Sequence, residues 1–387
     1  MENMILRQIT FIAILFVLMF SCFQPVLAVD APGVIVLEQE DGIYSVQSDG
    51  RGLKKLTDGG DGPVLVSPDG KKIAYFDDSQ IFVKSLEGEA SCIYKGEEGA
   101  SLSLLAWFPF SNGLIFRKIQ EDGKIQYLLL NDEQMTIKDL GTFSDFPSIA
   151  PRGKYWLYTV HPEGKTGTEV YGGLLGEKGR YVFEGATKDV LWWDVEHQIV
   201  LYSLNDKVYG YGLEDRSRNI INLPYKDICM IGFSPSMILY YNQDTENKPP
   251  GLHLFDYERG EQKEFIEKKK FFMRVSTNKT ADKFIIFAPN NPKNPMGEGE
   301  LYLVETTEGT ALKLTQDTGR RIFTLINMDN QWSPDGKYFV YEKLKLKHSQ
   351  VKKSDVYVAG NNKEEKITIG KKPFKFYTNP VWAELKN

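Results

Sequence analysis

The chain has 387 residues, enough for two or three ordinary domains or for one large repeat domain. Hydrophobic residues make up 42%, charged residues 26% and aromatic residues 13%, which excludes a disordered chain and predicts an aromatic-rich core. The formal net charge of −5 argues against a general nucleic-acid-binding protein, which is expected to be basic.

The amino terminus has the pattern of a secretory signal peptide. Arg7 precedes the apolar run Ile9 to Phe20, which is too short to span a bilayer comfortably. Val26 to Ala28 then supplies the small or β-branched residues that precede a cleavage site. We therefore expect residues 1–28 to be removed and residues 29–387 to form one exported domain. No later segment is apolar enough to hold the mature protein in a membrane.

The three cysteines raise two further questions. Cys22 follows Leu-Met-Phe-Ser, which loosely resembles a lipoprotein cleavage sequence, so lipid attachment at Cys22 is the alternative to cleavage after Ala28. Cys92 and Cys229 remain in the mature protein, and an exported chain can pair cysteines. The fold argued below separates them too far for a disulfide, so we expect two free thiols.

One stretch near the start of the domain returns near its end. Val66 to Phe76 reads VSPDGKKIAYF, and Trp332 to Lys343 reads WSPDGKYFVYEK. Weaker copies begin at Trp107, Ile149, Trp193, Phe233 and Ser276, with a last fragment at Asn379. Repeats at this spacing, between about 40 and 56 residues, are typical of stacked supersecondary units.

Each unit reads as four short strands. The segments after the repeated stretch alternate apolar and polar residues, are rich in Val, Ile, Tyr and Phe, and end at Gly, Asn or Asp. No segment longer than about ten residues has a convincing helical period. Four-stranded units of this length predict an all-β chain folded as a β-propeller, whose blades bury their faces against their neighbours.

The Ser-Pro-Asp-Gly sequence is interpreted as a turn rather than a catalytic signature. Pro sets φ for the first corner, Asp bonds the backbone ahead, and Gly accepts a positive φ. A catalytic Ser or Asp would not be expected in several blades at once. We therefore predict a tight turn between the first two strands of a blade.

These turns resemble the WD40-like repeats called PD40, which occur in the TolB family. Related propellers occur in prolyl oligopeptidases and tricorn-type proteases. The resemblance implies the fold over most of the mature chain and specifies no reaction. The chain departs from those families, because strands begin almost at once at Val34 and no Gly-x-Ser-x-Gly sequence occurs.

Strand counting favours eight blades, with seven as the alternative. The first strand of a blade is expected near Pro63, Leu102, Phe146, Asp189, Ile228, Phe272, Met328 and Asn379. The last of these has no following strands, and three strands precede the first. We therefore expect one blade to combine three amino-terminal strands with one carboxy-terminal strand, which closes the ring and removes exposed sheet edges.

No residue pattern predicts an active site or a cofactor. A metal at the central channel is a less favoured alternative; the aspartates near the ends of first strands that could hold it are equally expected as turn formers: Asp189, Asp194, Asp227 and Asp329. His161, His197, His253 and His348 lie far apart and have no short metal-type spacing. Five of the six tryptophans (all except Trp156) fall in or at the end of first strands, so core packing is favoured over a carbohydrate platform.

The sign of the charge in the longer loops differs between blades. The loops of blades five to seven are expected to form a basic arc, and acidic loops lie on the opposite arc. The candidate binding residues are Lys268, Lys269, Lys270, Arg320, Arg321, Lys343, Lys345, Lys347, Lys352, Lys353, Lys371 and Lys372. Several cations together can bind one polyanionic surface.

The sequence therefore predicts an exported, monomeric, non-enzymatic propeller without a cofactor. Its expected partner is a protein, a peptide or an anionic envelope surface, and not a nucleic acid. The alternative is a propeller lyase or lactonase acting on a sugar acid or lactone at the central channel. A purely structural surface protein is a third possibility.

Overall fold

The computed structural model describes residues 31 to 384 with gaps. The signal-peptide prediction therefore lies outside the described residues. The gaps are 109–110, 132–135, 142–147, 150–154, 165–166, 176, 185–189, 195–198, 205–206, 214, 224–227, 235–236, 243–250, 268–272, 279, 281, 292–298, 315–320, 324–330, 348–349, 361–362 and 368–379.

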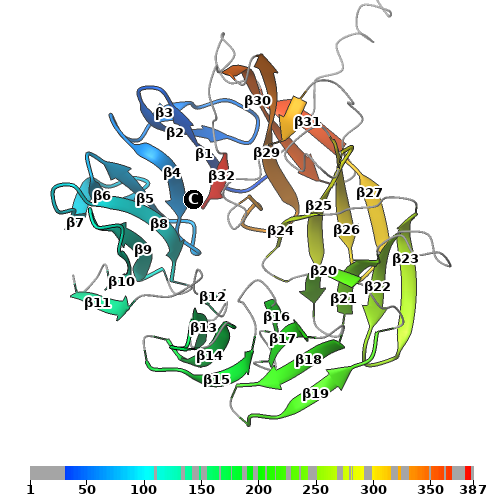
Figure 1. Ribbon diagram of the computed structural model, residues 1–387. Helices are drawn as coiled ribbons and strands as arrows, with labels where there is room; N and C mark the ends of the chain where they lie inside the picture. The colour runs from blue at the N-terminus through cyan, green and yellow to red at the C-terminus, as the bar shows by residue number, and fades with distance from the viewer. Residues whose placement is uncertain are drawn as a thin grey trace, which may run out of the picture.

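The described residues form strands and no helix, so no helix there is long and apolar enough to cross a membrane. The strands build eight four-stranded antiparallel sheets, arranged one after another around a common centre (Figure 1). This all-β arrangement of four-stranded sheets is that of a β-propeller.

Sheets 1 to 4 follow one another along the chain. Sheet 1 contains β4 (Asp61–Val66), β5 (Lys72–Asp77), β6 (Gln80–Ser85) and β7 (Ala90–Lys95). Sheet 2 contains β8 (Ser101–Trp107), β9 (Gly113–Ile119), β10 (Ile125–Asn131) and β11 (Thr136–Gly141). Sheet 3 contains β12 (Ser148–Ile149), β13 (Tyr155–Val160), β14 (Glu169–Leu174) and β15 (Arg180–Glu184). Sheet 4 contains β16 (Val190–Asp194), β17 (Ile199–Leu204), β18 (Lys207–Gly212) and β19 (Arg218–Ile221).

Sheets 5 to 8 complete the arrangement. Sheet 5 contains β20 (Ile228–Ser234), β21 (Met237–Asn242), β22 (Gly251–Asp256) and β23 (Glu261–Glu267). Sheet 6 contains β24 (Met273–Thr277), β25 (Lys283–Pro289), β26 (Gly299–Glu305) and β27 (Thr310–Lys313). Sheet 7 contains β28 (Arg321–Phe323), β29 (Tyr338–Lys347), β30 (Gln350–Gly360) and β31 (Lys363–Ile367). Sheet 8 contains β1 (Val34–Gln39), β2 (Gly42–Gln47), β3 (Lys54–Lys55) and β32 (Val381–Ala383).

Sheet 8 combines strands from both ends of the chain. Val34, Ile35 and Val36 of β1 lie opposite Ala383, Trp382 and Val381 of β32, respectively. Figure 1 shows β32, in red, beside the blue β1 near the centre of the molecule. This is the pairing that the strand count predicts for the two ends.

The two Ser-Pro-Asp-Gly copies form the same turn. In the first, Ser67 Oγ donates to Asp69 Oδ1 at 2.6 Å, and the backbone N–H groups of Gly70 and Lys72 donate to the Ser67 carbonyl (2.7 Å) and to Ser67 Oγ (2.9 Å). Gly70 has φ +74°, which only glycine adopts readily.

The copy at Ser333 has the same hydrogen bonds within 0.1 Å, and Gly336 has φ +68°. The turn interpretation is confirmed.

Neighbouring turns also contact one another around one rim. The Asp69 N–H donates to Ser111 Oγ in the equivalent turn of sheet 2 at 3.0 Å. On the other side, the Glu384 N–H after β32 donates to the Gly70 carbonyl at 2.8 Å. These bonds join sheets 8, 1 and 2 through their turns.

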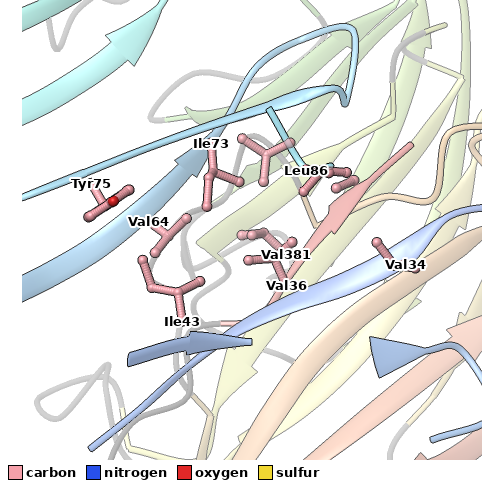
Figure 2. Close-up of a cluster of buried hydrophobic side chains, with 10 residues drawn as sticks. Val34, Val36, Ile43, Val64, Ile73, Tyr75, Leu86 and Val381 are labelled. Carbon is pink, nitrogen blue, oxygen red and sulfur yellow. The ribbon is translucent and has the colours of Figure 1, made fainter. Parts of the chain in front are cut away.

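The core lies between adjacent sheets rather than at the centre. Between sheets 8 and 1, a cluster of buried side chains includes Val36, Ile43, Val64, Ile73 and Val381 (Figure 2). Strand faces carry these apolar residues at alternate positions, so a sheet can bury both faces against its neighbours. Among the described residues, such clusters join sheet 8 to sheets 7 and 1, sheet 1 to sheet 2, and sheets 3 to 7 in succession.

The inner edge of sheet 7 is described in two places. Its first strand is expected near Met328, which lies outside the described residues. Just after it, Trp332 forms a bridge with Phe339, and the Val340 N–H donates to the Gln331 carbonyl at 2.7 Å. Further along β29, β28 at Arg321–Phe323 pairs with residues 343–345.

Candidate functional site

Sheet 7 contains a hairpin, β29–β30, whose two strands are longer than the other described strands. β29 and β30 have 10 and 11 residues, whereas the other described strands have at most 7. The sequence analysis placed Lys343 to Lys353 in a loop, and this prediction is wrong. Lysine and leucine alternate along Lys343 to Lys347, which is the period of a strand.

Lys343 is not part of an exposed patch. Its side chain is only 2% exposed, and Nζ lies 2.6 Å from Glu364 Oε1. The ammonium group also lies 4.2 Å from the ring centroid of Tyr357, and the Tyr341 hydroxyl donates to the same Glu364 carboxylate. Lys343 is thus a buried partner in the packing of sheet 7, and the prediction that it binds at the surface is wrong.

Lys353 lies next to a carboxylate that compensates part of its charge. Asp355 Oδ2 lies 2.7 Å from Lys353 Nζ, and Asp355 Oδ1 lies 2.7 Å from Lys366 Nζ. Burial alone would raise the pKa of Asp355, but the hydrogen bonds from Lys353 and Lys366 outweigh it, so the pKa lies below its ordinary value. One carboxylate therefore faces two ammonium groups.

Three cationic residues occupy one row across the extended part of sheet 7. Arg321 of β28 lies opposite Lys345 of β29, and Lys345 lies opposite Lys353 of β30. Lys345 is exposed, as is Lys352, the neighbour of Lys353. Like charges directly opposite each other destabilise an antiparallel pair. Asp355 offsets part of this repulsion at Lys353, but Lys345 stands between two cationic residues, so the row is the feature that most favours a binding role.

Of the remaining predicted binding residues, only Lys347 lies within the described part of the chain. Lys347 lies in β29 near the hairpin tip. The other six lie outside the described residues, so their position relative to the row stays a prediction: Lys268, Lys269, Lys270, Arg320, Lys371 and Lys372.

The two described histidines have different surroundings. His161 lies between β13 and β14, and its Nδ1 is 3.3 Å from Thr168 Oγ1. His253 is buried in β22, with Nε2 2.6 Å from Asn242 Oδ1 and Nδ1 3.2 Å from Gln262 Nε2. Within the part of the chain that the structure describes, no group of His, Cys, Asp and Glu side chains is arranged to hold a metal ion.

Three of the tryptophans that were assigned to first strands belong to the core, as predicted. Trp107, Trp332 and Trp382 are all buried. Trp107 Nε1 also donates to the Leu65 carbonyl of sheet 1 at 3.1 Å, which fixes sheet 2 against its neighbour. Cys92 is a free thiol, as expected.

Comparisons with known proteins show the fold alone. No protein-family model and no curated protein matches the chain. A solved structure described as the eukaryotic initiation factor is similar, with 10% identity over 91% of this chain and 98% of that chain and a TM-score of 0.57.

A structure from a study of two prolyl endopeptidases is also similar, with 11% identity, 89% and 51% of the two chains covered and a TM-score of 0.53. The chain thus spans about half of that protein's length. TolB from Acinetobacter baumannii is matched at 12% identity over 94% of this chain and 89% of that chain, but its TM-score of 0.38 carries no argument. The similarities support a β-propeller fold for this chain.

Proposed function

We propose that this protein is an exported, non-catalytic β-propeller. It binds an anionic protein or peptide segment through the end of the β29–β30 hairpin that contains Lys345 and Lys353. The row of Arg321, Lys345 and Lys353 carries the proposal. A row of like charges lowers the stability of a sheet, and an anionic partner would relieve that repulsion. Exposed Lys352 adds a further cation beside the row.

The fold part of the proposal is a closed ring of eight blades formed by residues 29–387, with PD40-type turns. The eight sheets within the described residues and the pairing of β1 with β32 support it. The equivalent turns at Ser67 and Ser333 support the resemblance to PD40 repeats. Export rests on the sequence of residues 1–28 alone.

The binding proposal is tested with a fluorescently labelled polyglutamate peptide, monitored by anisotropy. The test variant is Lys345→Glu/Lys352→Glu, and the control is Lys54→Glu/Lys138→Glu, which makes the same charge change on exposed lysines of β3 and β11. Each exposed charge contributes about 0.5–1 kcal/mol, so the test variant should bind about 5- to 30-fold more weakly.

The control variant should bind like the wild type, and all binding should weaken as salt shortens the screening length to about 8 Å. Equal loss in both variants would show a non-specific charge effect and overturn the proposal. Vesicles containing phosphatidylglycerol are the second probe. Binding to vesicles without binding to polyglutamate would replace the peptide partner by an anionic membrane surface.

A further inference from the structure

A groove lies between sheets 8 and 1, away from the basic row. Its volume is about 480 Å³, within the range of small-molecule sites, which is about 300–1,000 Å³. Leu56 to Gly59, which follow β3, form one wall, and side chains of sheet 1 and its β6–β7 turn form the other. Leu56 and Tyr75 also contact the buried cluster between these sheets, with Tyr75 at one end of it in Figure 2.

Carboxylates dominate the lining of this groove. Asp58, Asp77 and Glu89 contribute three negative charges, and Lys84 contributes the one positive charge of the described lining residues. Lys84 Nζ donates to the Gly88 carbonyl of its own turn, so its ammonium group is held against the backbone. Asp58 is almost fully exposed, and its Oδ1 lies 3.1 Å from Lys55 Nζ, which compensates part of its charge. The groove is therefore acidic.

Two polar groups inside the groove have no partner among the described residues. Tyr75 is only 4% exposed, and its hydroxyl makes no hydrogen bond with a described residue. The Asp77 carboxylate is half-buried and likewise has neither a hydrogen bond nor an ion pair there. Neither group is among the described polar atoms that are buried without a partner, so the hydroxyl and the carboxylate both face the open groove. Side by side and unbonded to the protein, they are available to a ligand that donates hydrogen bonds.

The backbone opposite Asp77 is shaped to let the carboxylate approach. A Cβ placed on Gly59 would lie 2.9 Å from Asp77 Oδ2 and 3.0 Å from Oδ1, which is closer than real Cβ contacts. A side chain at this position would displace the carboxylate. Gly59 therefore leaves room for the Asp77 carboxylate in its observed position.

We propose that this groove binds an organic cation, an alkylammonium or guanidinium group, which donates hydrogen bonds to the Asp77 carboxylate and the Tyr75 hydroxyl. Asp58 and Glu89 add negative charge at the rim. Leu56 and Ala90 supply apolar surface for the carbon chain next to the cation. A charge-assisted hydrogen bond to a half-buried carboxylate is stronger than a neutral one, so Asp77 supplies most of the affinity.

The chemistry fits two sources, a basic side chain of a peptide or a free diamine. Isothermal titration of the wild-type protein with capped lysine amide, capped arginine amide and putrescine separates them. Tighter binding of a capped amino acid identifies a protein side chain, and tighter binding of putrescine identifies a free diamine. Capped norleucine amide, which lacks the cation, should not bind. Equal heats for the norleucine and lysine compounds would overturn the proposal.

Substitutions locate the site. Asp77→Asn keeps the shape but removes the charge, and it should weaken binding about 10- to 100-fold. Tyr75→Phe retains the ring that stacks on Phe82 at 5.5 Å and removes only the hydroxyl, so a smaller loss is expected. The matched control is Asp78→Asn, the adjacent exposed carboxylate, which does not line the groove. An equal effect of Asp77→Asn and Asp78→Asn would overturn the proposal.

The wild-type protein gives an answer even if these variants fold poorly. The amide resonances of Gly59 and Gly88, at two sides of the groove, should shift on titration with the capped lysine amide. Unchanged resonances at both glycines would overturn the proposal. The site is independent of the proposed anionic partner, so Lys345→Glu/Lys352→Glu should leave these shifts intact.

Discussion

Deletion of residues 381 to 387 removes β32 and tests whether the ends of the chain close one ring. Val381 and Trp382 are 1% and 3% exposed and contact the two clusters on either side of sheet 8. Truncating a buried tryptophan costs about 3–5 kcal/mol, and exposing a buried valine costs about 1.5–3 kcal/mol. Their sum, about 5–8 kcal/mol, is comparable with the whole stability of a typical domain, about 5–15 kcal/mol.

In a closed ring, this loss should spread to sheets 7 and 1, because both contact β32. In an open array of repeats, the same deletion would disturb only its nearest neighbour. Thermal unfolding gives the total loss, and hydrogen exchange by mass spectrometry gives its distribution. The control deletes residues 385 to 387 and retains the Glu384 to Gly70 hydrogen bond. An unchanged unfolding temperature, or lost protection in β1 alone, would refute closure.

Three further predictions concern the turns and the ion pairs of sheet 7. Asp335→Ala should lower the free energy of unfolding in urea by about 1 kcal/mol, the typical net contribution of one hydrogen bond. Gly336→Val should lower it more, because φ is +68° at this position. Equal losses for the two variants would contradict the turn geometry. Lys343→Ala should cost about 3 kcal/mol because it removes the buried ammonium group that compensates the Glu364 charge, and a neutral effect would count against the buried pair. Because the pKa of Asp355 is lowered on folding, its contribution to stability is complete above the unfolded pKa of about 3.9 and is lost as the pH falls through the lower folded pKa. Asp355→Asn should therefore flatten the acid limb of the stability curve, and an unchanged limb would contradict the assignment.

The repeated turns made most of the fold predictable. Ser67 and Ser333 begin turns whose residue types specify their geometry, and counting strands from them places the inner strands of most sheets within about two residues. The strand β28 and the length of β29 were not predicted, because local sequence does not reveal how far two strands stay paired. The alternation of Lys and Leu in β29 was a readable signal, but its high charge favoured a loop interpretation.

The groove was not predictable from the sequence. Asp58, Asp77 and Glu89 come from three separate segments, and each is an ordinary charged residue beside a turn. Only packing shows that Asp77 and Tyr75 lack partners. Lys343 illustrates the opposite limit, because a lysine expected at the surface is neutralised by Glu364, which lies 21 residues further along the chain in β31, two strands away in the sheet.

The two Ser-Pro-Asp-Gly turns belong to sheets 7 and 1, which lie on either side of sheet 8. In sheet 8, no turn connects the inner strand β32 to its partner β1, because the two strands come from opposite ends of the chain. A Cβ on Gly33 would lie 2.4 Å from the Ala383 carbonyl oxygen and 3.2 Å from Pro334 Cγ, so the two chain ends and the sheet 7 turn touch. The pairing of β1 with β32 thus lies between two rigid turns, one from sheet 7 and one from sheet 1. Circular permutation exploits this kind of arrangement: a short linker across this pairing, with a new opening in an exposed hairpin such as Asp122 to Lys124, leaves every strand pairing in place. The position of the chain termini could then be changed without changing the fold.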